Sequence, residues 1–191
     1  MQRCKLHIVI AALGFVLASC GQKHHGATVD QSDPNLTLEN GVLELEGTPF
    51  TGRLVAYHSQ GELAYEATYS DGRKNGIERK WYTGNVLREE REYREGVKYG
   101  IHRGWWENGQ IQFRYEFNGD GLYEGARCEW YQNGQLFRDF NYVNGQESGS
   151  QRLWTTDGKI RGNYEVVGGE RFGLIGLKKC FTVTKDKNEI L

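Results

Sequence analysis

The residue types that most often carry out chemistry are few in this chain, and their spacing does not suggest catalysis. His58 and His102 are the histidines of the expected folded region, and neither has a nucleophile nearby in a strand-to-helix elbow. His102 follows Ile101, at a position that we expect on the solvent side. The chain has no Cys-x-x-Cys, no His-Glu-x-x-His and no phosphate-binding loop. We therefore expect no enzyme, no catalytic residue and no cofactor.

Two groups of polar residues could be considered as metal ligands. His24 and His25 are adjacent but lack a third partner nearby. Asn118, Asp120 and Glu124 lack the alternating acidic spacing of a calcium loop, and ordinary turn chemistry accounts for them. We expect no metal site.

The cysteines differ in what surrounds them. Cys128 stands two residues before Trp130 and is expected to be a small apolar filler. Cys180 lies about two repeat units further along, on the order of 20 Å away if the units form neighbouring strand pairs. Because a disulfide needs Cα atoms within about 7 Å, we expect no bridge between these two cysteines.

Cys20 ends a segment that looks like a targeting signal. Arg3 and Lys5 precede an apolar run over residues 8–18, which is too short to span a bilayer as a helix. The run ends in Leu-Ala-Ser-Cys-Gly at residues 17–21. This ending resembles the bacterial lipobox, with Ser at its third position. The alternative is an ordinary signal peptide with a chance cysteine.

The lipobox resemblance implies that residues 1–19 are a cleaved lipoprotein signal peptide and that Cys20 carries acyl chains. Two or three chains on one cysteine anchor a protein durably, so the lipid bilayer is an expected partner. The resemblance places the protein in a bacterial cell envelope. Because Gly21 rather than Asp follows the cysteine, the outer membrane is favoured over the inner one.

A tryptophan recurs along the rest of the chain at steps of 24 or 25 residues, at Trp81, Trp105, Trp130 and Trp154, and Tyr57 stands in the same phase one step earlier. A glycine keeps the same period, at Gly52, Gly76, Gly100, Gly125, Gly149 and Gly173. A fixed period of this length is typical of repeat architectures, in which one unit cannot bury its own apolar residues.

Each unit contains two short segments that alternate with a period of two, as β-strands do. In the third unit, Ile111, Phe113, Tyr115 and Phe117 alternate along the second segment, and Ile101, Arg103 and Trp105 are expected to share one face of the first. The turns carry Asn-Gly or Asp-Gly at residues 108–109, 133–134 and 157–158 and are expected to be tight hairpins, while repeat two reverses the order at 84–85. The single step of 25 is explained by one extra residue in the loop 118–124.

These observations predict an all-β fold, an elongated antiparallel meander of about five stacked β-hairpin repeats. The repeats lie near 52–75, 76–99, 100–124, 125–148 and 149–172 of a domain 41–184, with a cap at 173–184 and a tail at 185–191. Leu43 and Leu45 are expected in the first edge strand. Residues 20–40 are polar and rich in turn formers, which predicts a lipidated flexible tether.

The units resemble the MORN repeat variant found in YwqK-type antitoxin-like proteins, with the pattern Gly-x4-Trp/Tyr-Tyr-x-Asn-Gly-x-Leu and a later Tyr and Gly. The resemblance covers residues 52–173. It departs from the pattern at Tyr57, at the reversed Gly84-Asn85 and at Val166, which replaces the closing aromatic residue. The resemblance implies a MORN-like fold, and the family label implies an antitoxin role.

Charge and composition exclude a nucleic-acid partner, because the net charge is −1 and no basic run exists. The remaining candidate for a functional site is a binding surface, since Trp, Tyr and Arg dominate interface hot spots. A candidate binding stripe consists of Arg79, Trp81, Arg103, Trp105, Trp130, Arg152 and Trp154. The alternative is an intramolecular ladder that flanks the core.

Three functions follow from these features. The first is a lipid-anchored envelope module that binds or scaffolds an unknown protein partner. The second is an antitoxin or immunity lipoprotein, and the third is an anchored cell-wall hydrolase.

Overall fold

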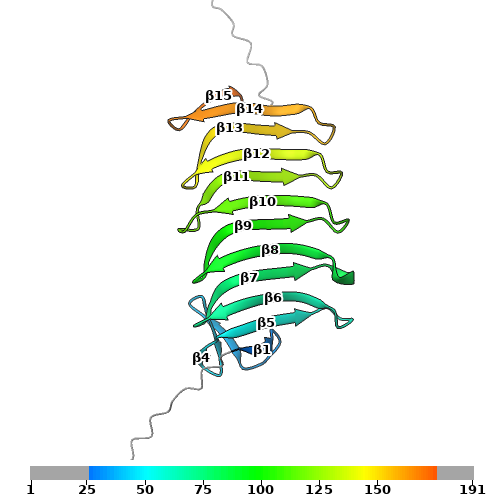
Figure 1. Cartoon of the computed structure of the whole chain (residues 1–191), viewed down its shortest axis with the longest axis vertical. Coiled ribbons are helices and arrows are strands. Elements are labelled where there is room, and N and C mark those ends of the chain that lie inside the picture. Colours follow the sequence, from blue (N-terminus) through cyan, green and yellow to red (C-terminus); the bar gives the residue numbers. More distant parts are fainter. Residues whose placement is uncertain (1–25, 176–191) are drawn as a thin grey trace, which may run out of the picture.

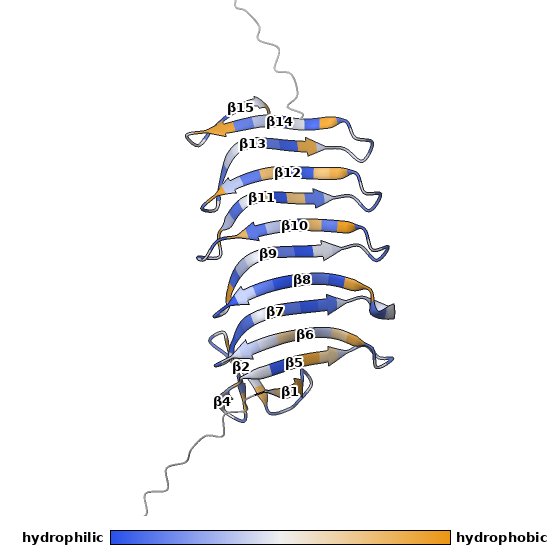
Figure 2. Cartoon of the chain, viewed as in Figure 1, coloured by the Kyte–Doolittle hydropathy of each residue, from blue (hydrophilic) through white to orange (hydrophobic). Residues whose placement is uncertain are grey.

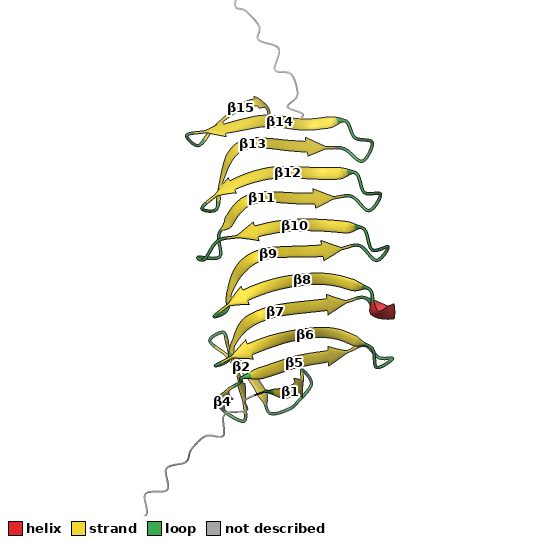
Figure 3. Cartoon of the chain, in the orientation of Figure 1, coloured by secondary structure: helices red, strands yellow, loops and turns green. Residues whose placement is uncertain are grey.

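The computed structural model describes residues 26–175, which form strands joined by short turns. One long sheet carries most of these strands, stacked like rungs, and a small sheet packs at its N-terminal end (Figure 1). Figure 3 shows one short helical turn, η1 (Thr83–Asn85), at the end of the second hairpin.

The long sheet has twelve strands. In spatial order they are β1 (Ala27–Asp30), β5 (Gly52–Tyr57), β6 (Leu63–Ser70), β7 (Arg73–Trp81), β8 (Leu87–Arg94), β9 (Val97–Trp105), β10 (Ile111–Phe117), β11 (Tyr123–Trp130), β12 (Leu136–Val143), β13 (Gln146–Trp154), β14 (Ile160–Val167) and β15 (Glu170–Leu174). From β5 onwards each strand pairs antiparallel with the next one in the chain. The predicted meander of five hairpins is therefore confirmed.

The N-terminal end of the sheet differs from the prediction. β1 pairs parallel with β5, with Ala27 opposite Gly52 and Val29 opposite Leu54. A separate three-stranded sheet follows, formed by β2 (Leu36–Glu39), β3 (Val42–Leu45) and β4 (Thr48–Pro49). The expected edge strand with Leu43 and Leu45 is thus wrong, because both side chains belong to β3 and pack into a buried cluster with Phe50.

The flexible tether predicted for residues 20–40 is also wrong over β1 and β2. Three apolar residues of this stretch, Ala27, Val29 and Leu36, pack against the same cluster around Phe50 and Leu54, whereas Leu38 is exposed. The polar composition of this stretch therefore gave no indication of the two short strands that cover the N-terminal end of the sheet. Residues 1–25 and 176–191 lie outside the described part, and with them Cys20, Cys180, most of the predicted cap and the tail.

Most turns fall into two kinds, and not as the Asn-Gly signal suggests; the reversed pair Gly84-Asn85, with positive φ at both residues inside a hairpin, is an exception. Both turn residues have positive φ at Asp71-Gly72, Glu95-Gly96 and Asn144-Gly145, which join one repeat to the next. At the expected tight turn Asn108-Gly109, only the glycine has positive φ, and the Trp106 amide closes a longer loop onto the Gln110 carbonyl. Two-residue turns with both φ angles positive match the twist of the paired strands. The extra residue of the fourth repeat lies in the loop between β10 and β11, as predicted, where the Asn118 amide donates to the Leu122 carbonyl.

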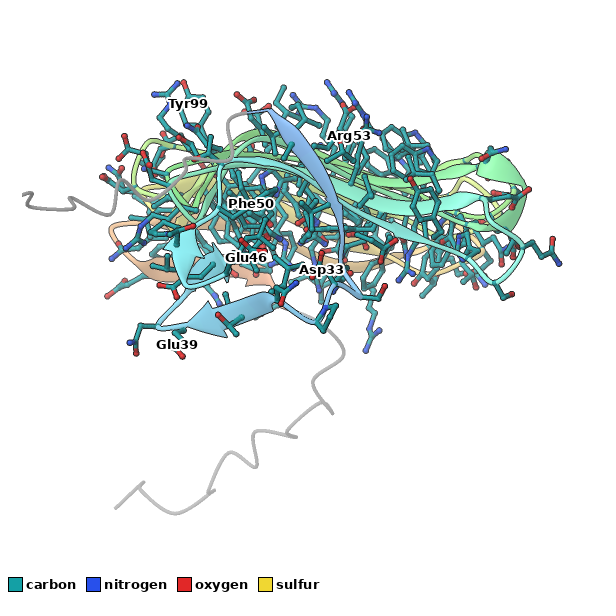
Figure 4. All side chains as sticks on the ribbon, turned by 90° about the horizontal axis from the view of Figure 1, so that it is seen from below. Asp33, Glu39, Glu46, Phe50, Arg53 and Tyr99 are labelled. Atoms are coloured by element: carbon teal, nitrogen blue, oxygen red, sulfur yellow. The ribbon has the colours of Figure 1, made fainter. Side chains whose placement is uncertain are left out.

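The two faces of the long sheet are distinguished by strand pairing. Phe113, Tyr115 and Phe117 stand opposite Gly104, His102 and Gly100 on β9, and we call their side the inner face. Arg103 stands opposite Arg114 on the other side, the outer face, which also carries Trp105. Figure 4 looks along the sheet and shows Arg53 and Tyr99 on the outer side and the small sheet with Glu39 on the inner side.

The core lies on the inner face. The buried strand residues there include Leu54, Ala67, Glu78, His102, Phe113, Phe117, Phe140, Tyr142, Gln151, Tyr164 and Val166. The expectation that His102 faces solvent is wrong, because its side chain is only 2% exposed. The tryptophans of the period are half-buried and lie outside this core.

A bulge at the start of the second strand of each hairpin explains one further error. Ile111 was expected beside Phe113, but it pairs with Trp105, and the register shifts between Ile111 and Phe113. The extra residue, Gln112, resets the alternation, so that Ile111 moves to the outer face. The strand period of two assigns residues to the correct face on either side of the bulge, but it assigns them to the wrong face across the bulge.

Candidate functional site

A ladder of side-chain hydrogen bonds joins the hairpin ends of successive repeats. The residue after each Trp position reaches the backbone carbonyl of the Trp one repeat further on. Tyr82 Oη donates to Trp105 O at 3.2 Å, Trp106 Nε1 to Trp130 O at 3.2 Å, and Tyr131 Oη to Trp154 O at 3.1 Å. His58 Nε2 lies 3.2 Å from Trp81 O in the same place. We call these four side chains the staple residues.

Beside the staple residues lie the bulge residues, which repeat with the same period. Each hairpin has one unpaired residue at the start of its second strand. They are Ala64, Arg88, Gln112, Phe137 and Arg161. Because a bulge inserts one residue and turns the local strand, it re-aims these side chains next to the staples.

Two hollows lie along this part of the inner face. The first measures about 970 Å³ and lies between the small sheet, with Leu36 and Leu43, and strands β5–β8, with Tyr65 and Glu78. The second measures about 620 Å³ and is lined by the staple residues Tyr82, Trp106 and Tyr131. Both are lined by Arg88. We treat them as one surface, the inner groove, which crosses the strands at their hairpin ends.

Acidic side chains of the inner face are each shared by several cations. Lys74 and Tyr65 Oη hydrogen-bond to Glu78 Oε2, and Lys80 Nζ lies 4.0 Å from Glu78 Oε1. Since Glu78 is only 3% exposed, the lysines compensate a nearly buried charge.

Two further acids repeat this arrangement along the groove. Arg91 Nη2 and Lys80 Nζ lie 2.9 and 3.2 Å from Glu89 Oε2. Glu129 Oε1 accepts from Arg127 at 3.0 Å and from Arg138 at 2.8 Å. The inner face therefore holds its acids between cations and aromatic rings in successive repeats.

Cations outnumber acids on the inner face of β7–β12. This face carries seven cationic side chains, which are Lys74, Lys80, Arg88, Arg91, Lys98, Arg127 and Arg138. It carries three acidic side chains, which are Glu78, Glu89 and Glu129. Figure 2 shows hydrophilic residues along β7, β8 and β9, counting both faces of the sheet. The face is therefore positive, although the whole chain has a net charge of −1.

Titration shifts on this face follow from burial and from these contacts. Burial alone would lower the pKa of Lys74, but the hydrogen bond and charge of Glu78 outweigh it and raise that pKa above 10.5. Burial, with the nearby Glu129, raises the pKa of Tyr115 to about 12. Burial lowers the pKa of His102 below 6.5, and its Nε2 lies 2.8 Å from the Glu92 carbonyl. His102 is thus neutral at pH 7 and adds no charge to the groove.

The candidate stripe of the outer face is largely occupied by contacts within the sheet. Arg79 lies 3.2 Å from Glu66 and 2.9 Å from Glu90, and Arg103 lies 3.8 Å from Glu90. Arg152 stands opposite Asp139. This arrangement supports the intramolecular ladder that the sequence left open, while a binding role of the stripe stays a prediction.

The tryptophans of the stripe share the outer face, and two of them also reach the groove. Trp81 lines the first hollow and Trp130 the second. Trp105 and Trp154 stand at the same strand ends, opposite Ile111 and Ile160. The structure thus brings part of the predicted stripe to the rim of a site on the other face.

Cys128 lies between Arg114 and Asp139 on the outer face. Burial, with the neighbouring Asp139 carboxylate 3.7 Å from the thiol, raises its pKa to about 11. The thiol is therefore protonated at neutral pH and is a poor nucleophile.

Part of the chain matches a known repeat family. Residues 123–144, which cover β11 and β12, match the MORN repeat variant. The MORN part of the resemblance is thereby supported, and the YwqK-type assignment stays a prediction. No curated protein matches the chain. Within residues 26–175, no helix is long and apolar enough to cross a membrane.

Proposed function

We propose that this chain is a scaffold that binds a protein partner in the inner groove. Repeats of the MORN type are in general protein- or membrane-binding modules, which is compatible with this role. The observation that carries the proposal is that two hollows on one face of a repeat sheet share Arg88 in their linings. The staple residues hold neighbouring hairpins together, so the groove is formed before a partner arrives and little ordering entropy is lost on binding.

We further propose that the scaffold is held at a membrane by acyl chains on Cys20. The lipobox-like residues 17–21 support this anchor, and the expected location is the bacterial envelope. Globomycin, which blocks cleavage of lipoprotein signal peptides, tests the anchor directly. An uncleaved chain should accumulate, and a Cys20→Ser variant should leave the membrane fraction. Cleavage that continues in the drug would contradict the anchor.

Site-specific crosslinking in native envelopes tests the groove. A photoreactive amino acid replaces Gln112, a bulge residue that lines the second hollow. The matched control places the same group at Arg152 on the outer face. We expect a discrete crosslinked protein from position 112 and none from position 152. Crosslinks only from position 152 would move the site to the predicted Trp–Arg stripe.

An antitoxin or immunity role remains the second proposal, and it rests on the family label alone. It requires that the crosslinked partner arrests growth when it is produced without this chain. Co-production of the chain should then restore growth. A partner that does not arrest growth would contradict the antitoxin role and would be compatible with the scaffold role.

A further inference from the structure

We propose that the inner groove binds an extended acidic segment of the partner protein, laid across the strands from repeat to repeat. The inference rests on the proposed function and adds the chemistry of the partner. It starts from the mismatch between seven cations and three acids on the inner face of β7–β12.

Hydrogen-bond donors are left over on this face. Within residues 26–175, the Nε atoms of Arg91, Arg127 and Arg138 are buried and have no hydrogen-bond partner. The acids that these arginines contact, Glu89 and Glu129, already accept from other cations. A buried donor without an acceptor is costly. The buried Nε atoms are out of reach of a bound chain, but the side chains of these arginines are 24–28% exposed, so added carboxylates can pair with their accessible guanidinium N–H groups.

Aromatic rings lie beneath most of these cations. Arg91 lies 5.8 Å from the Phe113 ring, Arg127 lies 5.3 Å from the Tyr115 ring and Arg138 lies 5.0 Å from the Phe137 ring. Lys98 lies 5.4 Å from the Phe117 ring. A cation held against a ring keeps its charge and loses side-chain freedom, so a carboxylate that pairs with it orders little further chain.

The repeat spacing predicts a pattern in the partner. Two strands at about 4.8 Å advance each repeat by about 10 Å. An extended chain in the polyproline II conformation advances about 3.1 Å per residue with three residues per turn, so every third side chain points to the same side. A segment that runs across the strands therefore passes one repeat every three residues or so. We expect acidic side chains at about every third position, with apolar side chains between them meeting the staple rings.

The shape of the groove favours a polypeptide over a membrane surface. The small sheet covers the first hollow, where Leu36 and Leu43 form one wall opposite the main sheet. A flat bilayer cannot enter such a space, whereas a single extended chain can. The embedded carboxylates of Glu78, Glu89 and Glu129 also repel a uniformly charged polymer at the places where it would pass them.

Fluorescence anisotropy of the full chain in detergent tests the inference. The probe is a labelled peptide of about twelve residues with Glu at every third position and Leu and Ser between them. The matched peptide carries Gln in place of each Glu. We expect the Glu peptide to bind at least about tenfold more tightly at low salt, and this advantage to fall as salt is raised.

Two variants of equal charge change locate the binding. Arg88→Glu alters the residue shared by both hollows, and its side chain is 51% exposed, so folding should be kept. Arg152→Glu makes the same change on the outer face. We expect Arg88→Glu to weaken the Glu peptide about tenfold and Arg152→Glu to leave it unchanged. Equal affinity for Glu and Gln peptides, or equal loss from both variants, would overturn the inference.

Two competitors distinguish the sources of negative charge. Vesicles of phosphatidylglycerol and single-stranded poly(dT) should not displace the Glu peptide. Displacement by either would assign the groove to a membrane or a nucleic acid instead. If the Glu peptide fails to bind while position 112 still crosslinks a protein, the inference of an acidic partner segment is wrong and the proposed function is kept. If position 112 gives no crosslink either, both fall.

Discussion

At the scale of single residues, the periodic glycines show what the repeat requires of its sequence. From the second repeat onwards they have positive φ, from 65° at Gly100 to 116° at Gly173, inside or beside a strand. The register of the strand pairs between repeats shifts near several of them, as between Tyr115 and Phe117 on β10. A left-handed residue with no Cβ permits this irregularity, which explains why the glycine keeps the period.

Replacing Gly125 with alanine should therefore destabilise the protein by about 1–2 kcal/mol. Its φ is +74°, and an added Cβ would lie 2.6 Å from Glu116 Oε2. Gly119→Ala is the control, because Gly119 lies in a loop without positive φ and with nothing within 4 Å of an added Cβ. Urea denaturation measures both variants, and equal midpoints for the two would contradict this account of the period.

His102 makes stability depend on pH in a known direction. Burial, with Arg91 and Lys98 nearby, lowers its pKa below 6.5 in the folded state. The unfolded chain therefore takes up this proton first as the pH falls, so stability is full above pH 6.5 and decreases below it. His102→Gln should flatten this part of the stability profile. A profile between pH 7 and pH 5 that is unchanged in the variant would contradict the assignment.

Prediction of single residues from the sequence was least successful where the local strand geometry decides which face of the sheet a side chain lies on. The sequence gives no sign that His102 is buried, because the strand faces can be assigned only after the bulge is known. The bulge residues Ala64, Arg88, Gln112, Phe137 and Arg161 have no chemical type common to all five. Their position is visible only as an interruption of the period of two. The cationic character of the inner face depends on this assignment and so could not be predicted either.

At the scale of the hairpin, the period and the turn residues were enough to predict the strands. The five hairpins fall within the predicted repeats, except that the first strand of each later repeat begins a few residues before the periodic glycine. The staple residues were present in the sequence as a second periodic position after the Trp, at His58, Tyr82, Trp106 and Tyr131. The regular spacing of ring-bearing residues next to a turn could have predicted contact between successive turns.

Removal of one staple hydrogen bond should loosen one contact between repeats. Tyr131→Phe deletes the bond from Tyr131 Oη to the Trp154 carbonyl and keeps the ring, which should cost about 0.5–1.5 kcal/mol. Tyr57→Phe, at an exposed ring of the first repeat, is the matched control and should be close to neutral. Thermal unfolding followed by circular dichroism compares the two. A larger loss at Tyr57 would show that the staples do not join the repeats.

At the scale of the whole molecule, a repeat sheet contacts mainly its nearest neighbours, so its two ends need protection. β1 and the small sheet cover the first end, and they lie in a stretch whose composition is typical of a tether. Short strands with few apolar residues carry little periodic signal, and the parallel pairing of β1 joins residues 25 positions apart, such as Ala27 and Gly52. This closure also forms the first hollow, which is why the groove was not foreseen.

Binding by paired variants tests the central claim most directly, namely that the partner lies in the inner groove. The measurement is the affinity of the partner identified by crosslinking for the full chain carrying Arg88→Glu or Arg152→Glu. We predict a loss of about tenfold or more for Arg88→Glu and an unchanged affinity for Arg152→Glu. Full affinity in Arg88→Glu together with a loss in Arg152→Glu would place the partner on the outer face and contradict the account.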